Sequence, residues 1–392
     1  MADKNMLQGD GTPTFGSADN LPLYPGATLG VIGGGQLGRM FAHAATQRGY
    51  RVVVLDPAET GPAAEVASMH LRYAYDDPEG LEKLASVCDA VTTEFENVPA
   101  SSLRFLQQRI PVSPKPEAVE VAQNRIREKQ FFVDHNLPTN RFERITNAAQ
   151  ITEAWSAMSG KAVIKTTQLG YDGKGQCVCD SADDAQAAFN SFGGVECVLE
   201  DFVAFDLEVS VVLARDCTGT VKTFPLAENR HKNGILDVCI VPARVSDTIA
   251  ENARGIACKL AEALNYVGVL AIEMFVAGDR IVLNEIAPRP HNSGHYTIDA
   301  TNYSQFDQQV LTLCGLNAVA IELYRPAVMA NILGDVLLQE NFDWSALDSG
   351  GDNHLHMYGK TEARAGRKMG HINFVGDDVD QLLDRVQTLR SG

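Results

Sequence analysis

Two glutamates in the second half of the chain are spaced to meet across one β-hairpin. Glu273 and Glu285 each lie in an apolar run, and residues 278–280 separate the runs. If those residues form the loop, Glu273 lies opposite Glu285 on one face, and Phe275 lies opposite Leu283. Two carboxylates ~4 Å apart repel by about 4 kcal/mol at an effective dielectric of about 20. Inside a cleft they therefore need a cation or a shared proton, and oxygen ligands suit Mg²⁺, which normally also binds nucleotide phosphates. A different register would leave one carboxylate in solvent.

A run of hydrogen-bond donors follows this hairpin directly, within residues 287–295. The donors are Arg289, His291, Asn292 and Ser293. Donors concentrated beside Mg²⁺ suit a small oxyanion. His291 and His295 have the spacing of a zinc pair on a helix, but Pro290 and Gly294 disfavour a helix here, so we do not expect zinc.

The first glycine-rich loop has the dinucleotide-binding pattern G-x-G-x-x-G. Its glycines are Gly33, Gly35 and Gly38, between an expected strand and an expected helix, and Asp56 ends the next strand. Glycines there let a phosphate approach the helix N-terminus, and the acid can bind a ribose hydroxyl. Any tight turn between a strand and a helix also selects glycine, so the loop alone leaves NAD binding open.

A second glycine-rich loop, residues 166–176, follows a strand that ends at Lys165. Its glycines are Gly170, Gly173 and Gly175, and it does not match the Walker A pattern. We expect a hairpin tip that covers phosphates with backbone N–H groups, with Lys165 at its base. A plain hairpin with a solvated lysine is the alternative. Residues 198–203 read as a strand running into a linker, which can present backbone groups to an adenine edge.

A short basic segment stands out in an acidic protein. The chain has 33 Lys and Arg against 50 Asp and Glu, a net charge of −17. Between residues 354 and 371 the basic side chains are Lys360, Arg364, Arg367 and Lys368, with the single acid Glu362. Lys360 and Arg367 could clamp a phosphate, or the segment could be a solvated loop. The overall acidity argues against a nucleic-acid partner.

The elements that must position these groups indicate an α/β chain of 392 residues, enough for two or three domains. The expected elements are strands at 28–32, 51–55, 90–93 and 209–213, and helices at 36–49, 117–135 and 247–264. Apolar strands that alternate with helices predict a parallel sheet at the start of the chain. We expect residues 1–25 to be a disordered leader, and we see neither a membrane span nor a secretory signal. Eight scattered cysteines fit the cytoplasm.

Together these segments resemble the ATP-grasp superfamily. The resemblance is carried by residues 30–40, 93–97, 170–176, 284–295 and 358–371, and it covers roughly residues 25–390. It implies an α/β ATP-grasp fold with a Rossmann-like N-terminal domain and a small C-terminal subdomain. The expected boundaries are 1–25 for the leader, 26–120 for the N-terminal domain, 121–203 for the ATP-grasp lid, 204–330 for the core and 331–392 for the C-terminal subdomain.

The resemblance also implies an activity in purine biosynthesis. ATP, bicarbonate and 5-aminoimidazole ribonucleotide would give ADP, phosphate and the N-carboxylated ribonucleotide through carboxyphosphate, in a cytoplasmic homodimer that uses ATP and Mg²⁺. Neither a nucleic acid nor a membrane is expected as a partner. The alternatives are a formate-dependent glycinamide ribonucleotide transformylase, an NAD-dependent oxidoreductase and a non-catalytic nucleotide-binding module. The donor-rich run favours bicarbonate over formate.

Site residues are carried over by the same resemblance. ATP would be held by Arg125, Lys165, the loop Gly170, Tyr171, Asp172, Gly173, Lys174, Gly175 and Gln176, then Glu200, Asp201, Phe202, Val203, Glu208, His231, Asn284 and Glu285. Mg²⁺ would bind Glu273 and Glu285. The catalytic set would be Arg289, His291, Asn292 and Ser293 around carboxyphosphate, with Tyr171 and Asp172. The ribonucleotide would contact Gln36, Leu37 and Glu94, with its phosphate on Lys360, Arg367 or Lys368.

Overall fold

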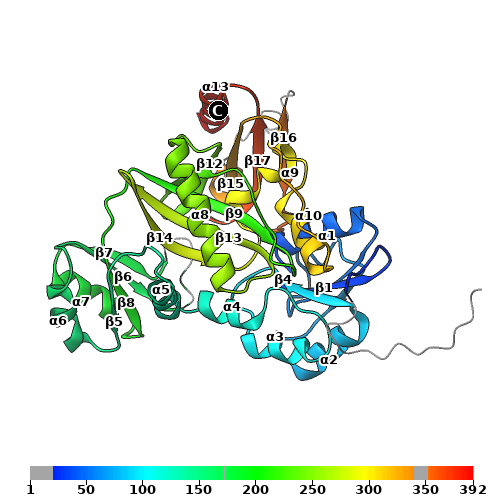
Figure 1. Cartoon of the computed structure of the whole chain (residues 1–392), viewed down its shortest axis with the longest axis horizontal. Coiled ribbons are helices and arrows are strands. Elements are labelled where there is room, and N and C mark those ends of the chain that lie inside the picture. The colour runs from blue at the N-terminus through cyan, green and yellow to red at the C-terminus, as the bar shows by residue number, and fades with distance from the viewer. Residues whose placement is uncertain (1–20, 169, 171–173, 340–351, 392) are drawn as a thin grey trace, which may run out of the picture.

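The protein is described here from a computed structural model, which covers residues 21–168, 170, 174–339 and 352–391 (Figure 1). Its first sheet is parallel, in the order β3-β2-β1-β4. The strands are β1 (Thr28–Ile32), β2 (Arg51–Leu55), β3 (Met69–Leu71) and β4 (Ala90–Thr93), and the helices are α1 (Gln36–Gln47), α2 (Pro78–Val87) and α3 (Ala100–Gln107). β1 and β4 are buried along their whole length, as continuous apolar strands covered on both faces require. The expected parallel sheet is confirmed.

A small antiparallel sheet forms the lid, in the order β5-β8-β6-β7. Its strands are β5 (Phe142–Ile145), β6 (Ala162–Thr166), β7 (Gln176–Cys179) and β8 (Cys197–Asp201), and α6 (Ile151–Ser156) and α7 (Ala182–Ser191) pack on it. The sequence predicts strands ending at Lys165 and at 198–203 in this region, and α7 was not predicted. That helix begins where the Ser181 side chain accepts a hydrogen bond from Asp184 N, the usual signature of an N-cap.

The large core sheet has the order β14-β13-β9-β11-β12-β15-β17-β16, with β10 beside β9. Its strands are β9 (Leu207–Arg215), β10 (Val221–Thr223), β11 (Ala227–Lys232), β12 (Ile235–Val241), β13 (Gly268–Ala277), β14 (Arg280–Ala287), β15 (Ala327–Leu333), β16 (Asn353–Met357) and β17 (Lys368–Val375). Its helices are α8 (Asp247–Ala263), α9 (Thr297–Ala300), α10 (Gln305–Leu313), α11 (Gly334–Leu337) and α13 (Val379–Ser391). The C-terminal strands thus extend the core sheet (Figure 1).

The helix expected over residues 117–135 is two helices, α4 (Pro116–Ala122) and α5 (Arg125–Asp134). Asn124 separates them, since its side chain accepts hydrogen bonds from Ile126 N and Arg127 N and caps α5. Asn competes well for such caps because its short side chain reaches the first free N–H groups of a helix. The break places Arg125 at the start of α5, where it faces the core sheet.

The hairpin of β13 and β14 pairs Glu273 with Glu285 as predicted, but by a different route. Ala277 pairs with Arg280, so the turn has two residues rather than three, and Phe275 pairs with Val282 rather than with Leu283. A β-bulge next to Glu273 then shifts the register. The extra residue lies in the strand and not in the turn, and both arrangements bring the two glutamates together.

The N-terminal domain and the core share apolar packing through α10. Phe306, Val310 and Leu313 of α10 lie in one buried cluster with Leu29 and Phe41 of the first domain. Close packing of this kind fixes the position of α10 relative to both domains. Among the helices that the structure describes, none combines the length and apolar character needed to cross a bilayer.

Residues 21–25 belong to the folded chain, although we expected the leader to extend to residue 25. Leu23 N donates to Cys314 O at 2.8 Å, and Tyr50 Oη donates to Leu23 O at 3.1 Å. The expected boundary at 330/331 falls inside β15 and that at 120/121 inside α4. The domain limits therefore stay predictions.

Candidate active site

A cavity of about 670 Å³ lies between the N-terminal domain, the core sheet and the C-terminal strands. This volume is in the usual range for small-molecule sites. The predicted site residues that line it are Gln36, Leu37, Glu94, Arg125, Gly170, Lys174, Glu273, Glu285, Arg289, His291, Asn292, Lys360, Arg367 and Lys368. Six segments of the chain therefore meet in one place, and they contain residues 36–37, 94, 125, 170 with 174, 273–292 and 360–368.

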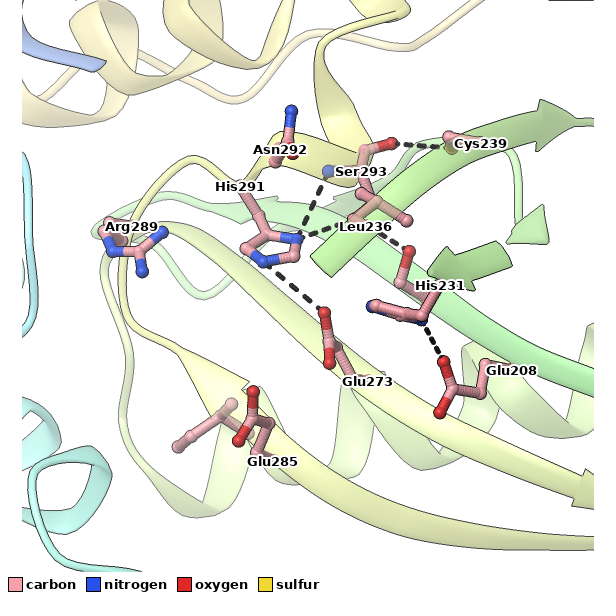
Figure 2. Close-up of polar contacts among 12 residues, drawn as sticks. Glu208, His231, Leu236, Cys239, Glu273, Glu285, Arg289, His291, Asn292 and Ser293 are labelled. Atoms are coloured by element: carbon pink, nitrogen blue, oxygen red, sulfur yellow. Dashed lines mark hydrogen bonds and ion pairs between the residues drawn. The ribbon is translucent and has the colours of Figure 1, made fainter. Parts of the chain in front are cut away.

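The paired glutamates lie on neighbouring strands of this cavity, below His291 in Figure 2. Arg125 Nη1 lies 2.7 Å from Glu285 Oε2. Burial opposes ionisation of Glu285, but Arg125 prevails and lowers the pKa of this carboxyl group. Burial, followed by the charge of Glu285, raises the pKa of Glu273 to about 7. Glu273 is therefore only partly ionised at neutral pH, and a nearby cation would favour its full ionisation.

The paired carboxylates of Glu273 and Glu285 fit the Mg²⁺ that the ATP-grasp resemblance implies. Two carboxylates share one face and repel, and carboxylate oxygens are ligands that Mg²⁺ prefers. Among the residues that the structure describes, His, Cys, Asp and Glu do not form a cluster of three that could hold a metal. Glu273 and Glu285 would therefore hold the ion together with phosphate oxygens and water, as is usual for Mg²⁺ at nucleotide sites.

The donor-rich run forms a loop held by buried partners (Figure 2). Ser293 N donates to His291 Nδ1 at 3.3 Å, so this nitrogen is an acceptor and Ser293 Oγ, 2.9 Å away, also donates to it. His291 Nε2 then carries the proton and lies 3.4 Å from Glu273 Oε1. Burial and then Arg289 lower the pKa of His291 well below its usual value, which keeps the ring neutral. Ser210 Oγ donates to Ser293 Oγ at 2.8 Å and completes the chain.

Two further contacts fix the loop from outside. Arg289 Nε donates to Glu96 Oε2 at 2.6 Å, and although burial opposes it, Arg289 lowers the pKa of Glu96. Asn292 and Asn331 exchange two side-chain hydrogen bonds, at 3.0 and 2.7 Å. The loop therefore presents a guanidinium, an imidazole N–H and an amide toward one cavity. Such a set stabilises a small oxyanion.

The first glycine loop has its anion position filled by the protein itself. Glu94 accepts hydrogen bonds from Gly35 N at 2.6 Å and from Gly38 N at 2.8 Å. Asp56, the residue that a dinucleotide ribose would need, accepts from Gly34 N and Tyr75 Oη, each at 2.7 Å. The N–H groups that would receive a pyrophosphate are thus already bonded to a carboxylate. The geometry argues against the NAD alternative.

A buried charge cluster joins the lid to α5 and β14. Glu200 Oε2 lies 3.1 Å from Lys129 Nζ and 3.2 Å from Lys165 Nζ, and Asn140 donates to it at 3.2 Å. Lys165 Nζ also donates to Asn284 Oδ1 at 3.4 Å. Burial would raise the pKa of Glu200, but Lys129 and then Lys165 lower it to about 2. The other carboxylate oxygen, Oε1, is buried without a hydrogen-bond partner in the described part of the chain.

A second pair lies beyond the glutamates, where His231 Nδ1 contacts Glu208 Oε2 (Figure 2). Burial would lower the pKa of His231, but the hydrogen bond and charge of Glu208 outweigh it and raise the pKa. Glu208 therefore favours the protonated, positively charged form of the His231 imidazole.

The remaining predicted residues lie outside the cavity lining or outside the described residues. Asp201 accepts from Ser159 N at 2.7 Å, and the exposed Phe202 ring lies beneath Lys161 Nζ at 4.8 Å, so both side chains engage other lid residues. Gln176 is an exposed end of β7. Tyr171, Asp172 and Gly173 fall outside the described residues. A cofactor role for these residues, and for Val203, stays a prediction.

Several residues that support the site were not among the predicted ones. They are Glu96, Lys129, Asn331, Ser210 and Gln305. For Lys129 a local signal existed, since Arg125, Glu128 and Lys129 occupy the i, i+3 and i+4 positions of one helix face. The others are ordinary polar residues whose role depends on which strand or helix lies next to them.

A Rossmann-like domain, an antiparallel lid and a core sheet with paired carboxylates define an ATP-grasp enzyme. Residues 130–306 match the ATP-grasp domain, residues 26–123 the ribonucleotide synthetase preATP-grasp domain and residues 327–385 the phosphoribosylaminoimidazole carboxylase C-terminal domain. The chain belongs to the N5-carboxyaminoimidazole ribonucleotide synthase family.

Relatives match over almost the whole chain. The N5-carboxyaminoimidazole ribonucleotide synthase of Brucella melitensis is 45% identical over 90% of this chain and 98% of its own. A Staphylococcus aureus N5-carboxyaminoimidazole synthetase complexed with ADP has a TM-score of 0.89 at 38% identity, over 94% of this chain and 98% of that one. An Aspergillus clavatus N5-carboxyaminoimidazole synthase, solved with ADP and 5-aminoimidazole ribonucleotide, has a TM-score of 0.86 at 28% identity, over 94% and 98%.

We predict that Glu200→Gln destabilises the protein by about 3–5 kcal/mol at neutral pH, because two buried ammonium groups lose their counter-charge. The pKa of Glu200 is about 2 in the fold against 4.5 ordinarily, so its ionic contribution is complete above pH 4.5 and is lost as the pH falls toward 2. Urea unfolding at pH 7 and across this acid range measures both effects, and the variant should depend less on pH there.

The exposed Glu143 on the neighbouring strand β5 provides the control for this test. Glu143→Gln should leave the free energy of unfolding almost unchanged. Equal stabilities of the Glu200→Gln variant and the parent at pH 7 would contradict the role of the charge cluster.

We also predict that MgATP raises the melting temperature and that NAD does not. A ligand at 100 times its dissociation constant adds about 2.7 kcal/mol to the stability of the folded protein. NAD should add nothing, because Glu94 occupies the N–H groups that its pyrophosphate requires. Thermal unfolding with each ligand is the measurement, and a comparable shift with NAD would overturn our interpretation of the first glycine loop.

Proposed function

We infer that this protein carboxylates 5-aminoimidazole ribonucleotide with bicarbonate at the expense of ATP. The products are N5-carboxyaminoimidazole ribonucleotide, ADP and phosphate, a step of purine biosynthesis. Family membership supports the reaction. The observation that carries it is the single cavity in which a carboxylate pair, an oxyanion-binding loop and a basic segment meet. Each of the three substrates thereby has groups of suitable chemistry next to the other two.

We assign the triphosphate side of the cavity to Arg125, Lys165 and Lys174, next to Glu273 and Glu285. Bound Mg²⁺ would neutralise phosphate charge as the γ-phosphoryl group is transferred. The unpartnered Oε1 of Glu200 is an acceptor of the kind that an adenine amino group can satisfy. Glu208, paired with His231, is assigned to the ribose hydroxyls. The loop 170–176 would cover the phosphates.

Bicarbonate and carboxyphosphate are assigned to Arg289, His291 and Asn292, with Ser293 setting the His291 tautomer. A bicarbonate oxygen attacks the γ-phosphorus, and the bond from phosphorus to the β–γ bridging oxygen breaks to release ADP. The neutral His291 ring offers an N–H to the developing oxyanion without competing as a base. The guanidinium of Arg289 stays charged throughout and compensates the negative charge that accumulates.

The ribonucleotide is assigned to the other end of the cavity. Gln36, Leu37 and Glu94 would contact its ribose and base, and Lys360, Arg367 or Lys368 its phosphate. Carboxyphosphate then gives CO₂ and phosphate as its C–O bond breaks, with the bond electrons going to phosphate. The exocyclic amine forms the new C–N bond to CO₂, and the amine proton passes to the released phosphate. Positioning of the amine against the carboxyl donor then accounts for much of the rate.

Three further points belong to this proposal. The protein is assigned to the cytoplasm, which its eight free cysteines support. It is proposed to act as a homodimer, which analytical ultracentrifugation would test. The domain limits at residues 26, 121, 204 and 331 stay proposals, although the second lies inside α4 and the last inside β15.

Phosphate release from MgATP tests the reaction. Release should require 5-aminoimidazole ribonucleotide and bicarbonate together, and omission of either in turn should reduce it to background. Release that depends on formate would favour the transformylase alternative. Binding of ATP without release in any mixture would favour a non-catalytic nucleotide-binding module.

Glu285→Gln should reduce phosphate release by about 100-fold or more, since removing one essential electrostatic group at a reacting phosphate has effects of this size. The fold should survive, because glutamine keeps the volume of the side chain. Circular dichroism and thermal unfolding check the fold, and the exposed Glu251→Gln on α8 is the matched control. Unchanged turnover in the Glu285→Gln variant would remove the metal assignment.

A further inference from the structure

Gln305, at the start of α10, holds the anion-binding loop by its backbone. Its side chain is fully buried. His291 N donates to Gln305 Oε1 at 2.9 Å, and Gln305 Nε2 donates to His291 O at 2.8 Å. An amide that bonds both the N–H and the C=O of one residue acts like a neighbouring β-strand, and it fixes the position of that residue in two directions.

Gly294 allows this close approach. A Cβ atom added at Gly294 would lie 2.4 Å from Gln305 Oε1 and 2.7 Å from its Cδ, well inside contact distance. The glycine in the donor-rich run is therefore explained by the amide that passes over it. The loop and Gln305 form one fitted unit.

The same amide also sets the tautomer of His295. The backbone of His291 fixes which end of the Gln305 side chain is the nitrogen, because an N–H must meet Oε1 and a C=O must meet Nε2. Nε2 has a second proton, and His295 Nδ1 lies 3.1 Å away. His295 Nδ1 is therefore the acceptor and Nε2 carries the ring proton. The ring lies tilted against His371, with the ring centroids 4.7 Å apart.

The helix that carries Gln305 is itself anchored to the N-terminal domain. Ser304 and Asp307 form a capping box at its start. Asp307 also forms an ion pair, at 3.0 Å, with Arg48, the residue that caps the C-terminal end of α1. One turn after Gln305, Gln309 Nε2 donates to Thr92 Oγ1 at 3.1 Å. Thr92 lies in β4, the strand that leads into Glu94. The loop for the carboxyl donor and the segment for the ribonucleotide are thus both anchored to α10 by hydrogen bonds.

We propose that Gln305 is a positioning residue for the carboxyl donor, which holds the 289–295 loop and the His295 tautomer in the arrangement that binds bicarbonate. This inference rests on the proposed function and deepens it. Gln305 contacts the loop and not the reacting atoms, so it acts through His291 and its neighbours. Its effect is expected on bicarbonate and not on ATP, because its contacts all lie on the loop side of the cavity.

Gln308 offers a control on the same helix. Its side chain is also fully buried, and it holds the backbone of Val319 in the same way, with Val319 N donating to Oε1 at 3.2 Å and Nε2 donating to Val319 O at 2.7 Å. A variant at either position loses two hydrogen bonds between a buried amide and the backbone. Among the described residues, Gln308 forms no hydrogen bond with the donor-rich loop, so the pair separates a loss of stability from a loss of positioning.

The test compares Gln305→Met, Gln305→Glu and Gln308→Met in the full chain. Both Gln305 variants should raise the KM for bicarbonate by roughly 10- to 100-fold, the effect that a misplacement of about 1 Å can have. The KM for ATP should change by less than about twofold. Gln308→Met should lower the melting temperature as much as Gln305→Met does, yet leave the KM for bicarbonate at the parent value. Gln305→Glu keeps the acceptor for His291 N and serves if Gln305→Met does not fold.

A second readout does not depend on turnover. In ¹⁵N-histidine spectra of the parent, the His295 ring should have an unprotonated Nδ1 and a protonated Nε2, and Gln305→Met should change this signal while Gln308→Met does not. The proposal is overturned if both Gln305 variants keep the parent KM for bicarbonate, if Gln308→Met raises it equally, or if the His295 signal is the same in all variants. A parent protein without bicarbonate-dependent phosphate release would instead contradict the proposed function. The spectra would then still test whether Gln305 sets the tautomer of His295.

Discussion

The repulsion between Glu273 and Glu285 is the constraint around which the rest of the site is organised. Two carboxylates on facing strands of one hairpin are costly inside a protein. The fold compensates one of them with Arg125, which α5 delivers because Asn124 ends the preceding helix. The other lies under the His291 ring, beside the loop assigned to bicarbonate. Glu273, which Arg125 does not neutralise, therefore lies where a magnesium-bound triphosphate would bind.

Buried ionic contacts on either side keep this geometry rigid. Lys129 and Lys165 converge on Glu200 at the base of the lid, and Glu96 meets Arg289 across the boundary with the N-terminal domain. A buried charge with a well-placed partner resists displacement, because breaking the pair leaves the remaining charge unsolvated. Lys165 and Arg289 therefore have fixed positions before any substrate arrives, which is what positioning catalysis requires.

Much of this could be predicted from the sequence, and the reasons differ between residues. The pairing of Glu273 with Glu285 was predicted from an assumed three-residue turn between two apolar strands, and the pair forms because a bulge in the strand supplies the residue that the turn lacks. The break at Asn124 was missed because a helical pattern continues on both sides of it, and only the cap geometry separates the helices. The partners Glu96 and Asn331 lie far in sequence from the loop that they hold, so no spacing rule reports them. The first glycine loop matched a dinucleotide pattern because the backbone is the same, whereas the carboxylate that fills it comes from another strand.

The β-bulge beside Glu273 has a consequence for how this hairpin can change in evolution. Turn length and strand register compensate each other here, since the residue that a longer turn would hold is accommodated within the strand. An insertion at the tip would move every side chain beyond it to the opposite face of the sheet, and so would a deletion at the bulge. The two changes together would cancel. Homologous hairpins with different loop sizes can therefore keep the same acidic pair, provided that each gain at the tip is matched by a loss in the strand.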